Sequence, residues 1–433
     1  MRKNNRFISF ILIAALLTVF VSCSTKNENE GNQGNTLQGG SYTLTVWGAE
    51  EDQEMLKEMC DAFAKANPQN KYTFQFGVQG EGEAADKVLN DVQSGPDVYS
   101  FSSDQINKLF AGGALARVGG DIESDIKKVN TAESVNAATI TINNENQLYA
   151  YPCTGDNCLF LYYDKSVYKN PDDVKSLDTI LRIANDAGKK VHFKLNDDGW
   201  YLSSFFFAKP ELKYEVTYND KMAEQKVDIN FDSKDGLDVM KALRTYLMNN
   251  ALVAQTDDSK IIAAFTEKNG KREAAAAVSG TWNAATIKKL LGDNMGVAKL
   301  PSVKINEKDT QLSGYMGYKM IGVNGYSKNK GEAHKLAQWL TSESNQLKRF
   351  EKRGFGPTNI KVTDMEKVKK NEVIAAVLDQ AQYNRAQKSV PATYWTPMAS
   401  LITPIITAKA NGTQVTDAML QSYLDALCKQ IRK

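Results

Sequence analysis

Four tryptophans of this chain stand where a ligand could reach their rings. Trp47, Trp200 and Trp282 follow predicted strands or lie in polar loops, and Trp395 opens a predicted helix after Pro391. A flat aromatic face packs against the C–H face of a sugar-like ring, and a nearby carboxylate accepts hydrogen bonds from its hydroxyl rim. Each tryptophan alone is more often a packing residue than a ligand contact. Four of them beside acidic residues favour a binding site.

The acidic partners lie close to these rings in the sequence. Glu50 and Glu51 follow the first tryptophan, Asp198 precedes the second, and Asp104 comes just after a short predicted strand that ends at Phe101. In open α/β sheets, ligands bind beyond the carboxyl ends of the parallel strands. We therefore expect these four acids, together with Phe101, to line a ligand cleft.

A further acid stands in the run 151–158, where an extended, proline-marked segment meets a polar turn. The next run, 159–163, is continuously apolar, as expected of a strand buried on both faces in a second sheet. This change of pattern raises the hypothesis that the chain crosses from one domain to another here. We expect Asp156, at this crossing, to place its carboxylate in the cleft.

Signals for enzymatic chemistry are weak. The chain has two histidines, His192 and His334, in stretches that resemble a strand and a helix, so neither a histidine-based catalytic group nor a metal cluster is expected. We find no phosphate loop, no dinucleotide-binding turn, no His-Glu-x-x-His motif and no nucleophile elbow. Asp104 with Asp156 remains a possible glycosidase pair, because the separation of two carboxylates cannot be read from a sequence. We predict a binding protein without a cofactor.

The elements that position these residues alternate between strands and helices. A strand at 42–46, a helix at 55–66 and a strand at 72–78 predict a β-α-β unit with a parallel strand pair. Further strands are expected at 98–101, 159–163, 191–195, 274–278, 297–300 and 320–323, with a hairpin at 139–151. Further helices are expected at 86–92, 106–110, 180–184, 237–247, 287–291, 333–340, 374–381, 398–408 and 415–431.

The N-terminal segment has the pattern of a secretion signal. Basic residues precede the apolar run 7–21, which is too short to span a bilayer comfortably and ends at Ser22-Cys23. A small residue followed by cysteine resembles the lipobox of bacterial lipoproteins, although Phe20 replaces the usual aliphatic residue. We expect Cys23 to be acylated after residues 1–22 are removed, with ordinary secretion as the alternative. The polar stretch 24–40 is then a flexible tether.

Composition and charge exclude several partners. The 433 residues are 42% hydrophobic and 24% charged, which is ordinary for a globular chain of two or three domains. Loss of the leader takes the formal net charge from +2 to −1, because it removes Arg2, Lys3 and Arg6. No basic field favours nucleic acid. With no second apolar run of about twenty residues, the lipid is the expected membrane attachment.

Four cysteines follow Cys23, namely Cys60, Cys153, Cys158 and Cys428. Outside the cell, an even number permits disulfides, although the sequence does not fix their connectivity. A disulfide between Cys153 and Cys158 would stiffen the crossing. Two free, partly buried thiols are the alternative, and the sequence favours neither.

The stretches that carry the candidate residues resemble those of maltose/maltodextrin-binding proteins, the extracellular solute-binding proteins (family 1) of ABC importers. The matching stretches begin at Trp47 and continue through 95–104, 149–164, 279–282, 295–301 and 394–395, so that the resemblance covers 41–433. It implies an α/β fold of two lobes, of the type II periplasmic-binding-protein kind. Each lobe holds an α/β sheet, and the ligand cleft lies between the lobes.

The resemblance also implies boundaries and roles. Lobe one would comprise 41–152 and 316–366, lobe two would comprise 156–313 and 370–433, and hinge crossings would lie at 151–158, 313–316 and 366–370. Asp104 and Asp156 resemble the family's two cleft acids, and Trp200, Trp282 and Trp395 resemble the aromatics of the second lobe. The implied protein is monomeric, is anchored to the cell membrane, and passes an oligosaccharide of maltose or maltodextrin type to an ABC permease.

Several positions depart from the family pattern and put the particular sugar in doubt. Phe101 stands where those proteins often have Trp, Gln105 where they have Arg, and Glu50-Glu51 where an Asp-Lys pair contacts sugar. Asp197-Asp198-Gly199 replaces a Glu-Pro. The alternatives are an extracellular glycoside hydrolase that uses its paired aspartates, and a solute-binding protein for a peptide or for a polyamine, whose cation would suit acids beside aromatics.

Overall fold

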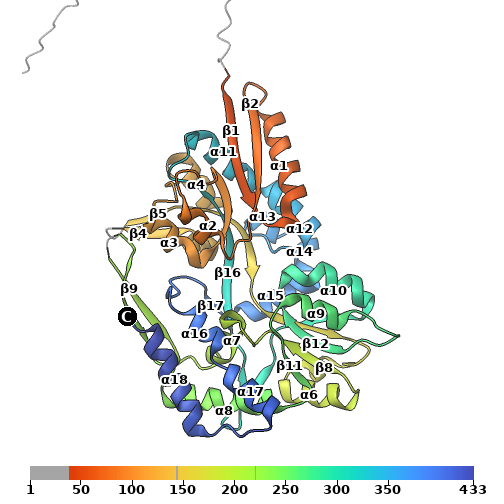
Figure 1. The fold of residues 1–433 in the computed structure, drawn as a ribbon. Coiled ribbons are helices and arrows are strands. Elements are labelled where there is room, and N and C mark those ends of the chain that lie inside the picture. The colour runs from red at the N-terminus through yellow and green to blue at the C-terminus, as the bar shows by residue number, and fades with distance from the viewer. Residues whose placement is uncertain (1–38, 143–144, 220) are drawn as a thin grey trace, which may run out of the picture. The chain divides into compact units, whose positions relative to one another are not determined.

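Two separate β-sheets organise this chain, and helices cover each of them (Figure 1). The computed structural model describes residues 39–142, 145–219 and 221–433, of which Gly40–Lys433 form one compact unit. The leader, the acylation site Cys23 and nearly all of the tether lie outside the described residues. The prediction of an α/β fold with two sheets is confirmed.

The first sheet is built from strands that lie far apart in the chain. They are β1 (Ser41–Gly48), β2 (Lys71–Val78), β3 (Val98–Ser102), β6 (Tyr151–Asn157), β16 (Tyr315–Val323) and β17 (Arg385–Ala386). Their order is β17-β16-β3-β1-β2, and β6 pairs with β16 beside this path. β1 is parallel to β2 and to β3, and α1 (Gln53–Ala66) joins β1 to β2. The predicted β-α-β unit is therefore confirmed.

The second sheet has the order β11-β8-β12-β7-β13. Its strands are β7 (Phe160–Asp164), β8 (Lys190–Phe193), β11 (Leu252–Ala254), β12 (Ala274–Ser279) and β13 (Met295–Ala298). β8 is parallel to β11 and to β12, whereas β7 is antiparallel to β12 and to β13. In β7, Leu161 packs into one apolar core, while Phe160 and Tyr162 pack into another. The continuous apolar run of this strand is explained by its two covered faces.

Three two-stranded ribbons complete the strands of the described residues. They are β4 (Thr139–Ile142) with β5 (Glu145–Leu148), β9 (Tyr214–Tyr218) with β10 (Glu224–Ile229), and β14 (Ser302–Ile305) with β15 (Lys308–Gln311). The first of these is the predicted hairpin. The other two were not predicted, because their strands mix charged and apolar residues in short, irregular runs.

The helices cover the faces of the sheets and follow most of the predicted ranges. Around the first sheet they are α2 (Ala84–Asn90), α3 (Ile106–Ala111), α4 (Gly120–Val129), α5 (Ala132–Ala137), α11 (Lys330–Leu340), α12 (Glu343–Arg353), α13 (Ile360–Thr363) and α14 (Glu366–Lys369). The other helices are α6 (Leu177–Asp186), α7 (Gly199–Phe206), α8 (Lys234–Met248), α9 (Asp258–Phe265), α10 (Ala284–Leu291), α15 (Glu372–Ala381), α16 (Trp395–Ser400), α17 (Thr403–Asn411) and α18 (Asp417–Ile431).

One predicted helix is divided in two. The helix expected at 398–408 is interrupted between α16 and α17, and Pro404 stands in the first turn of α17. A proline inside a continuous helix would clash with the carbonyl four residues earlier, here that of Ser400, and would remove a hydrogen bond. The chain therefore starts a new helix at the proline.

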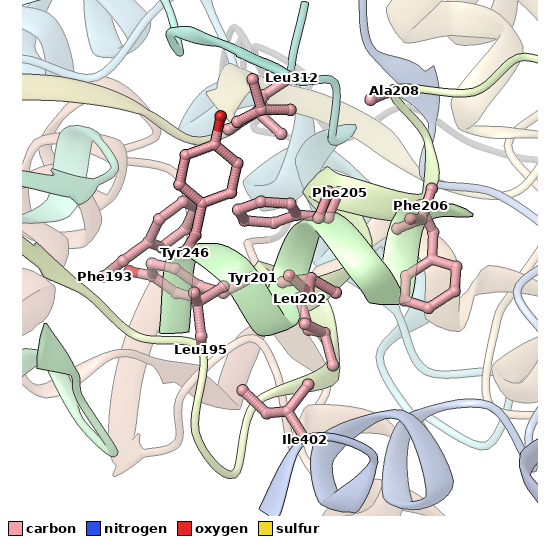
Figure 2. Packing of buried hydrophobic residues seen from close by; sticks show 14 of the residues in the cluster. Phe193, Leu195, Tyr201, Leu202, Phe205, Phe206, Ala208, Tyr246, Leu312 and Ile402 are labelled. Atoms are coloured by element: carbon pink, nitrogen blue, oxygen red, sulfur yellow. The ribbon is translucent and has the colours of Figure 1, made fainter. Parts of the chain in front are cut away.

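Helix α7 is packed on nearly all sides, which explains why it was not predicted. Tyr201, Leu202, Phe205 and Phe206 of this helix are each at most 2% exposed. Figure 2 shows these side chains within the second-sheet core, with Phe193 and Tyr246 among their neighbours. A helix that is buried on nearly all sides, and whose serines are buried as well, has no clear amphipathic period.

Strand β16, and the segment made of β6 and the residue that follows it, contribute side chains to the cores of both halves. In β6, Tyr151 and Cys153 belong to the first-sheet core, and Cys158, just after this strand, belongs to a core beside the second sheet. In β16, Met320 belongs to the first-sheet core and Tyr315 to the second. These strands connect the two halves of the fold.

The possible disulfide at the crossing is not formed. Cys153 and Cys158 are free and buried, as are Cys60 and Cys428. Their placement in two different cores holds the two sulfur atoms apart, although only four residues separate them in the sequence. In the part of the chain that the structure describes, no helix has the length and apolar character needed to cross a membrane.

Candidate ligand-binding cleft

A cleft of about 600 Å³ lies between residues of the first sheet and residues of the second. On the first side, Asp52 follows β1 and Ser102 ends β3. On the second side, Lys194 follows β8 and Trp282 follows β12. These are carboxyl ends of parallel strands, the place where open α/β sheets bind ligands. A cavity of this volume is large enough for a small ligand.

Asp258 organises the second side of the cleft. It lies in the first turn of α9, where its Oδ1 accepts hydrogen bonds from the Tyr201 hydroxyl at 2.8 Å and the Trp282 indole N–H at 3.2 Å. The same oxygen accepts from Ser279 Oγ and Asn283 Nδ2, each at 3.1 Å. A single carboxylate therefore fixes the polar edge of this wall.

Trp200 and Trp282 form an aromatic corner in the cleft. Their ring centroids are 5.9 Å apart and the planes meet at 59°. The Trp200 N–H donates to Gln387 Oε1 at 3.0 Å, and that of Trp282 donates to Asp258. Both indole N–H groups are thus engaged within the protein, so that the rings are held in place and offer their apolar surfaces to a ligand.

Asp198 positions this corner. It caps α7, because its Oδ1 accepts the backbone N–H groups of Trp200 at 2.9 Å and Tyr201 at 3.0 Å. Its other oxygen lies 3.0 Å from Lys194 Nζ, which is also 3.4 Å from Asp258. Desolvation opposes the charge of Lys194, but the two carboxylates together raise its pKa. The lysine remains a cation shared by both acids.

Ion pairs make up the first side of the cleft. Arg353 Nε lies 3.0 Å from Asp52 Oδ1, and Lys319 Nζ lies 3.7 Å from Glu81. Both cations stand over the Phe355 ring, with Lys319 Nζ 4.2 Å from its centroid. Desolvation works against the Lys319 charge, yet Glu81, Asp156 and Asp52 raise its pKa. This wall therefore offers paired charges around one aromatic ring.

A second cavity, here called the distal chamber, adjoins the cleft. It also measures about 600 Å³, and Gly82 lines both spaces. Asp104 and Trp395 line the distal chamber. Burial raises the pKa of Asp104, whereas Ser102 and Gln387 lower it, and its Oδ1 has no hydrogen-bond partner within the described residues.

A close approach of two helices sets the position of Trp395. A Cβ added to Gly199 of α7 would lie 2.8 Å from both Met398 Cβ and the Trp395 carbonyl oxygen of α16. Glycine at this position therefore allows α16 to pack against the start of α7. As a result, Trp200 and Trp395 begin neighbouring helices, although each lines a different cavity.

The structure brings four of the predicted ligand residues together. Glu51, Asp198, Trp200 and Trp282 line the cleft. Asp104 and Trp395 line the adjoining distal chamber instead.

The other four predicted contacts do not line this cleft in the structure. Phe101 is 0% exposed and packs against Tyr99, because it faces the core side of β3 and leaves Ser102 to line the cleft. Asp156 is also 0% exposed, and its neighbour Asn157 lines the cleft in its place. Trp47 is half-buried against the first-sheet core, and the exposed Glu50 does not line the cleft.

Asp156 remains unusual in its buried position. Neither carboxylate oxygen has a hydrogen-bond partner among the described residues. Desolvation raises its pKa, and the nearby Lys319 opposes that rise. Because this side chain is buried outside both cavities, it does not form with Asp104 the pair of exposed carboxylates that a glycosidase requires.

Several lining residues were not predicted from the sequence. Asp258, Gln387, Lys319, Arg353 and Phe355 come from segments with no local signal of binding. The pair Asp257-Asp258 before an apolar run indicates a helix start. Because helix capping already explains two acidic residues at this place, nothing in the sequence assigns them to a ligand. No group of three or more His, Cys, Asp or Glu side chains in the described ranges is arranged to hold a metal ion.

The fold and this cleft are those of a binding protein with two lobes. Residues 58–376 match the family model described as bacterial extracellular solute-binding protein, and the chain belongs to this family. The predictions of the family, of the two-lobe fold and of a binding rather than an enzymatic role are confirmed.

Individual relatives match over nearly their whole length. The galactooligosaccharide-binding protein of Bacillus subtilis (strain 168) is 24% identical, over 96% of this chain and 96% of that protein. The maltodextrin-binding protein MdxE of the same organism is 23% identical, over 94% of this chain and 95% of that protein. A solved structure with acarbose is 33% identical, has a TM-score of 0.77, and covers 90% of this chain and 99% of that chain.

Proposed function

We propose that this protein binds an oligosaccharide in the cleft and delivers it to an ABC importer. The observation that carries the proposal is the aromatic corner of Trp200 and Trp282, whose N–H groups are held by Gln387 and Asp258. Aromatic surfaces beside carboxylates complement the C–H faces and hydroxyl rims of sugar rings. The relatives named for galactooligosaccharides and maltodextrins support the same ligand class.

Within that class, we favour an α-glucan of maltose or maltodextrin type. The resemblance of the cleft segments to maltodextrin-binding proteins supports this choice, as does the similarity to a structure with acarbose. A galactooligosaccharide is the competing ligand, since the relative with that name covers the chain equally well.

We also propose the lobe boundaries that the sequence suggests. Lobe one comprises 41–152 and 316–366, lobe two comprises 156–313 and 370–433, and the crossings lie at 151–158, 313–316 and 366–370. The sharing of β6 and β16 between the cores supports the first two crossings. Rotation of the lobes about these crossings would close the cleft around the sugar and change the surface that the permease meets.

The setting of the protein completes the proposal. The family is extracellular. We propose that acylated Cys23 anchors the chain to the cell membrane, that the tether lets the lobes reach the permease, and that the protein works as a monomer.

Isothermal titration calorimetry tests the ligand class. Maltotriose, a galactooligosaccharide, spermidine and a short peptide are titrated separately into the purified protein. Binding of maltotriose with clear preference over the others is the expected result. Binding of the galactooligosaccharide alone would replace the α-glucan, and binding of spermidine or the peptide alone would overturn the proposal.

A further inference from the structure

The β9–β10 hairpin connects the two halves of the fold. At its base, the Tyr214 ring lies 5.3 Å from that of Tyr394, and Val227 and Ile229 are buried in the second-sheet core. The backbone of Val227 exchanges two hydrogen bonds with that of Lys433, at 3.2 and 3.1 Å. In Figure 1, β9 runs from the side of α18 toward β4. The base is therefore fixed to the second lobe.

The far end of the hairpin contacts the first lobe. Met222 packs against the first-sheet core, with its backbone at a φ of 58°. The Asn219 side chain stabilises this turn by accepting the backbone N–H groups of Lys221 at 2.9 Å and Ala223 at 3.0 Å. A single ribbon thus touches both sides of the space between the lobes.

The side chains at this end form one wall of the distal chamber. Tyr218, Met222, Ala223 and Glu224 line it from the hairpin. Glu224 is itself held by the backbone N–H of Ala392, which donates to Oε1 at 2.8 Å. Along β9, Tyr218 is half-buried while the preceding Thr217 is exposed, as expected where one face of a strand lines a cavity.

Other residues that line the chamber carry groups suited to a sugar. Asp104, Gln105 and Asn107 line it from η2 (Ser103–Gln105) and α3, and Trp395 adds an aromatic ring. The chamber meets the cleft at Gly82, which lines both. Four of the predicted binding residues line the cleft and two, Asp104 and Trp395, line this chamber, so a ligand that contacts these six must extend through both spaces.

We propose that the distal chamber receives the continuing end of an oligosaccharide whose first units occupy the cleft, and that Tyr218 and Met222 of the hairpin determine which chain lengths bind tightly. This inference rests on the proposed function. The hairpin side chains line the chamber, so a longer sugar that enters it gains contacts with Tyr218 and Met222 that a short sugar does not reach.

Length dependence of affinity tests the inference. Calorimetric titrations use maltose, maltotriose and maltohexaose, or the matching galactooligosaccharides if those are the sugars that bind. We expect the wild-type protein to bind the longest sugar about tenfold or more tightly than the shortest. Tyr218→Ala is expected to reduce that preference to about threefold or less while the Kd for maltose stays unchanged, since one aromatic contact is lost only by the longer chain.

Matched variants separate this role from a loss of folding. Thr217→Ala, on the exposed face of the same strand, should keep the wild-type length preference. Met222→Ser should reduce it as Tyr218→Ala does, and it provides the test if Tyr218→Ala fails to fold. Sugar binding with an unchanged length preference in both hairpin variants overturns the inference but leaves the proposed function intact. Absence of binding for every sugar in the wild-type protein overturns the proposed function and this inference with it.

Discussion

Trp282 donates its indole N–H to Asp258 Oδ1 at 3.2 Å, and this bond fixes the angle at which the ring faces the cleft. Asp258 is in turn restrained by Tyr201 and by Lys194. The ring that would stack on a sugar is therefore held by a network anchored on α9 and α7. The contribution of the Trp282 ring to sugar affinity can be measured separately from that of Asp258, which holds the ring.

Replacement of Trp282 by alanine should weaken sugar binding by about 1 to 3 kcal/mol, because the ligand loses one apolar surface of the cleft. Calorimetric titration with the bound sugar measures the change. Trp339→Phe is the matched control: Trp339 lies in α11 and donates its N–H to the Met59 carbonyl at 2.9 Å, outside both cavities. This control should lower the melting temperature without changing the Kd. Equal affinity of Trp282→Ala and wild type would refute the stacking role.

Asp258→Ala should weaken binding by about 1 to 3 kcal/mol, since it leaves the donors that meet at Oδ1 without their acceptor and loosens the Trp282 ring. Asp258→Asn keeps one carbonyl oxygen but removes the charge that Lys194 faces, so a smaller loss is expected. The adjacent Asp257 caps α9 by accepting the Lys260 N–H at 3.0 Å. Because asparagine caps as well as aspartate, Asp257→Asn should change neither stability nor affinity. A comparable loss of sugar affinity in Asp257→Asn would show that the weaker binding comes from a disturbed start of α9 and not from the loss of the Asp258 carboxylate.

The fold could be predicted where periodicity and position agree. The alternating residues of β1, the amphipathic pattern of α1 and the apolar run of β7 each predict one kind of element. The structure contains all three elements. Helix α7 was missed because it is buried on nearly all sides, which removes the amphipathic period, and because the preceding run 196–199 is rich in turn-forming residues. Strand order, by contrast, depends on pairings between distant segments, such as β3 with β16.

The cleft could be predicted only in part, for two physical reasons. Near the end of a strand, the side on which a residue points cannot be read from sequence, so Phe101 and Asp156 were expected in the cleft while Ser102 and Asn157 occupy it. Asp258 has an acidic neighbour, Asp257, but this pair indicates a helix start, and Gln387 stands between Ala386 and Lys388 with no aromatic or acidic residue beside it. Asp258 and Gln387 reach the cleft only through tertiary packing, which joins Gln387 to Trp200 across 187 positions of the chain.

The free energy of unfolding should decrease as the pH falls below about 6.5, which is the ordinary pKa of a histidine side chain. His192 is fully buried and His334 is half-buried, and desolvation lowers the pKa of both imidazoles. The unfolded chain therefore takes up protons in a pH range where the folded protein does not, so the stability present above pH 6.5 is lost as the pH falls through the lowered values. Each histidine can contribute at most about 1.4 kcal/mol per pH unit.

Urea unfolding at several pH values between 7 and 5 measures this effect. The raised pKa values of Asp104 and Asp156 act in the opposite direction, so the comparison is made against His192→Gln and His334→Gln. Each variant should lose less stability than the wild type on acidification. If the free energy of unfolding falls equally with pH in the wild type and in both variants, neither histidine causes the loss of stability.

The thiols of Cys153 and Cys158 should remain free in the folded protein. Each is buried in a different core, and burial raises the pKa of both thiols, so little reactive thiolate is present at neutral pH. Burial likewise raises the pKa of Cys60 to about 12 and that of Cys428 to about 11.

A thiol reagent should therefore label these cysteines slowly in the native protein and completely in denaturant, without prior reduction. The melting temperature should not change on addition of dithiothreitol. A drop in melting temperature with reductant, together with two missing thiols in denaturant, would instead establish a bridge at the crossing and require Cys153 and Cys158 to leave their separate cores.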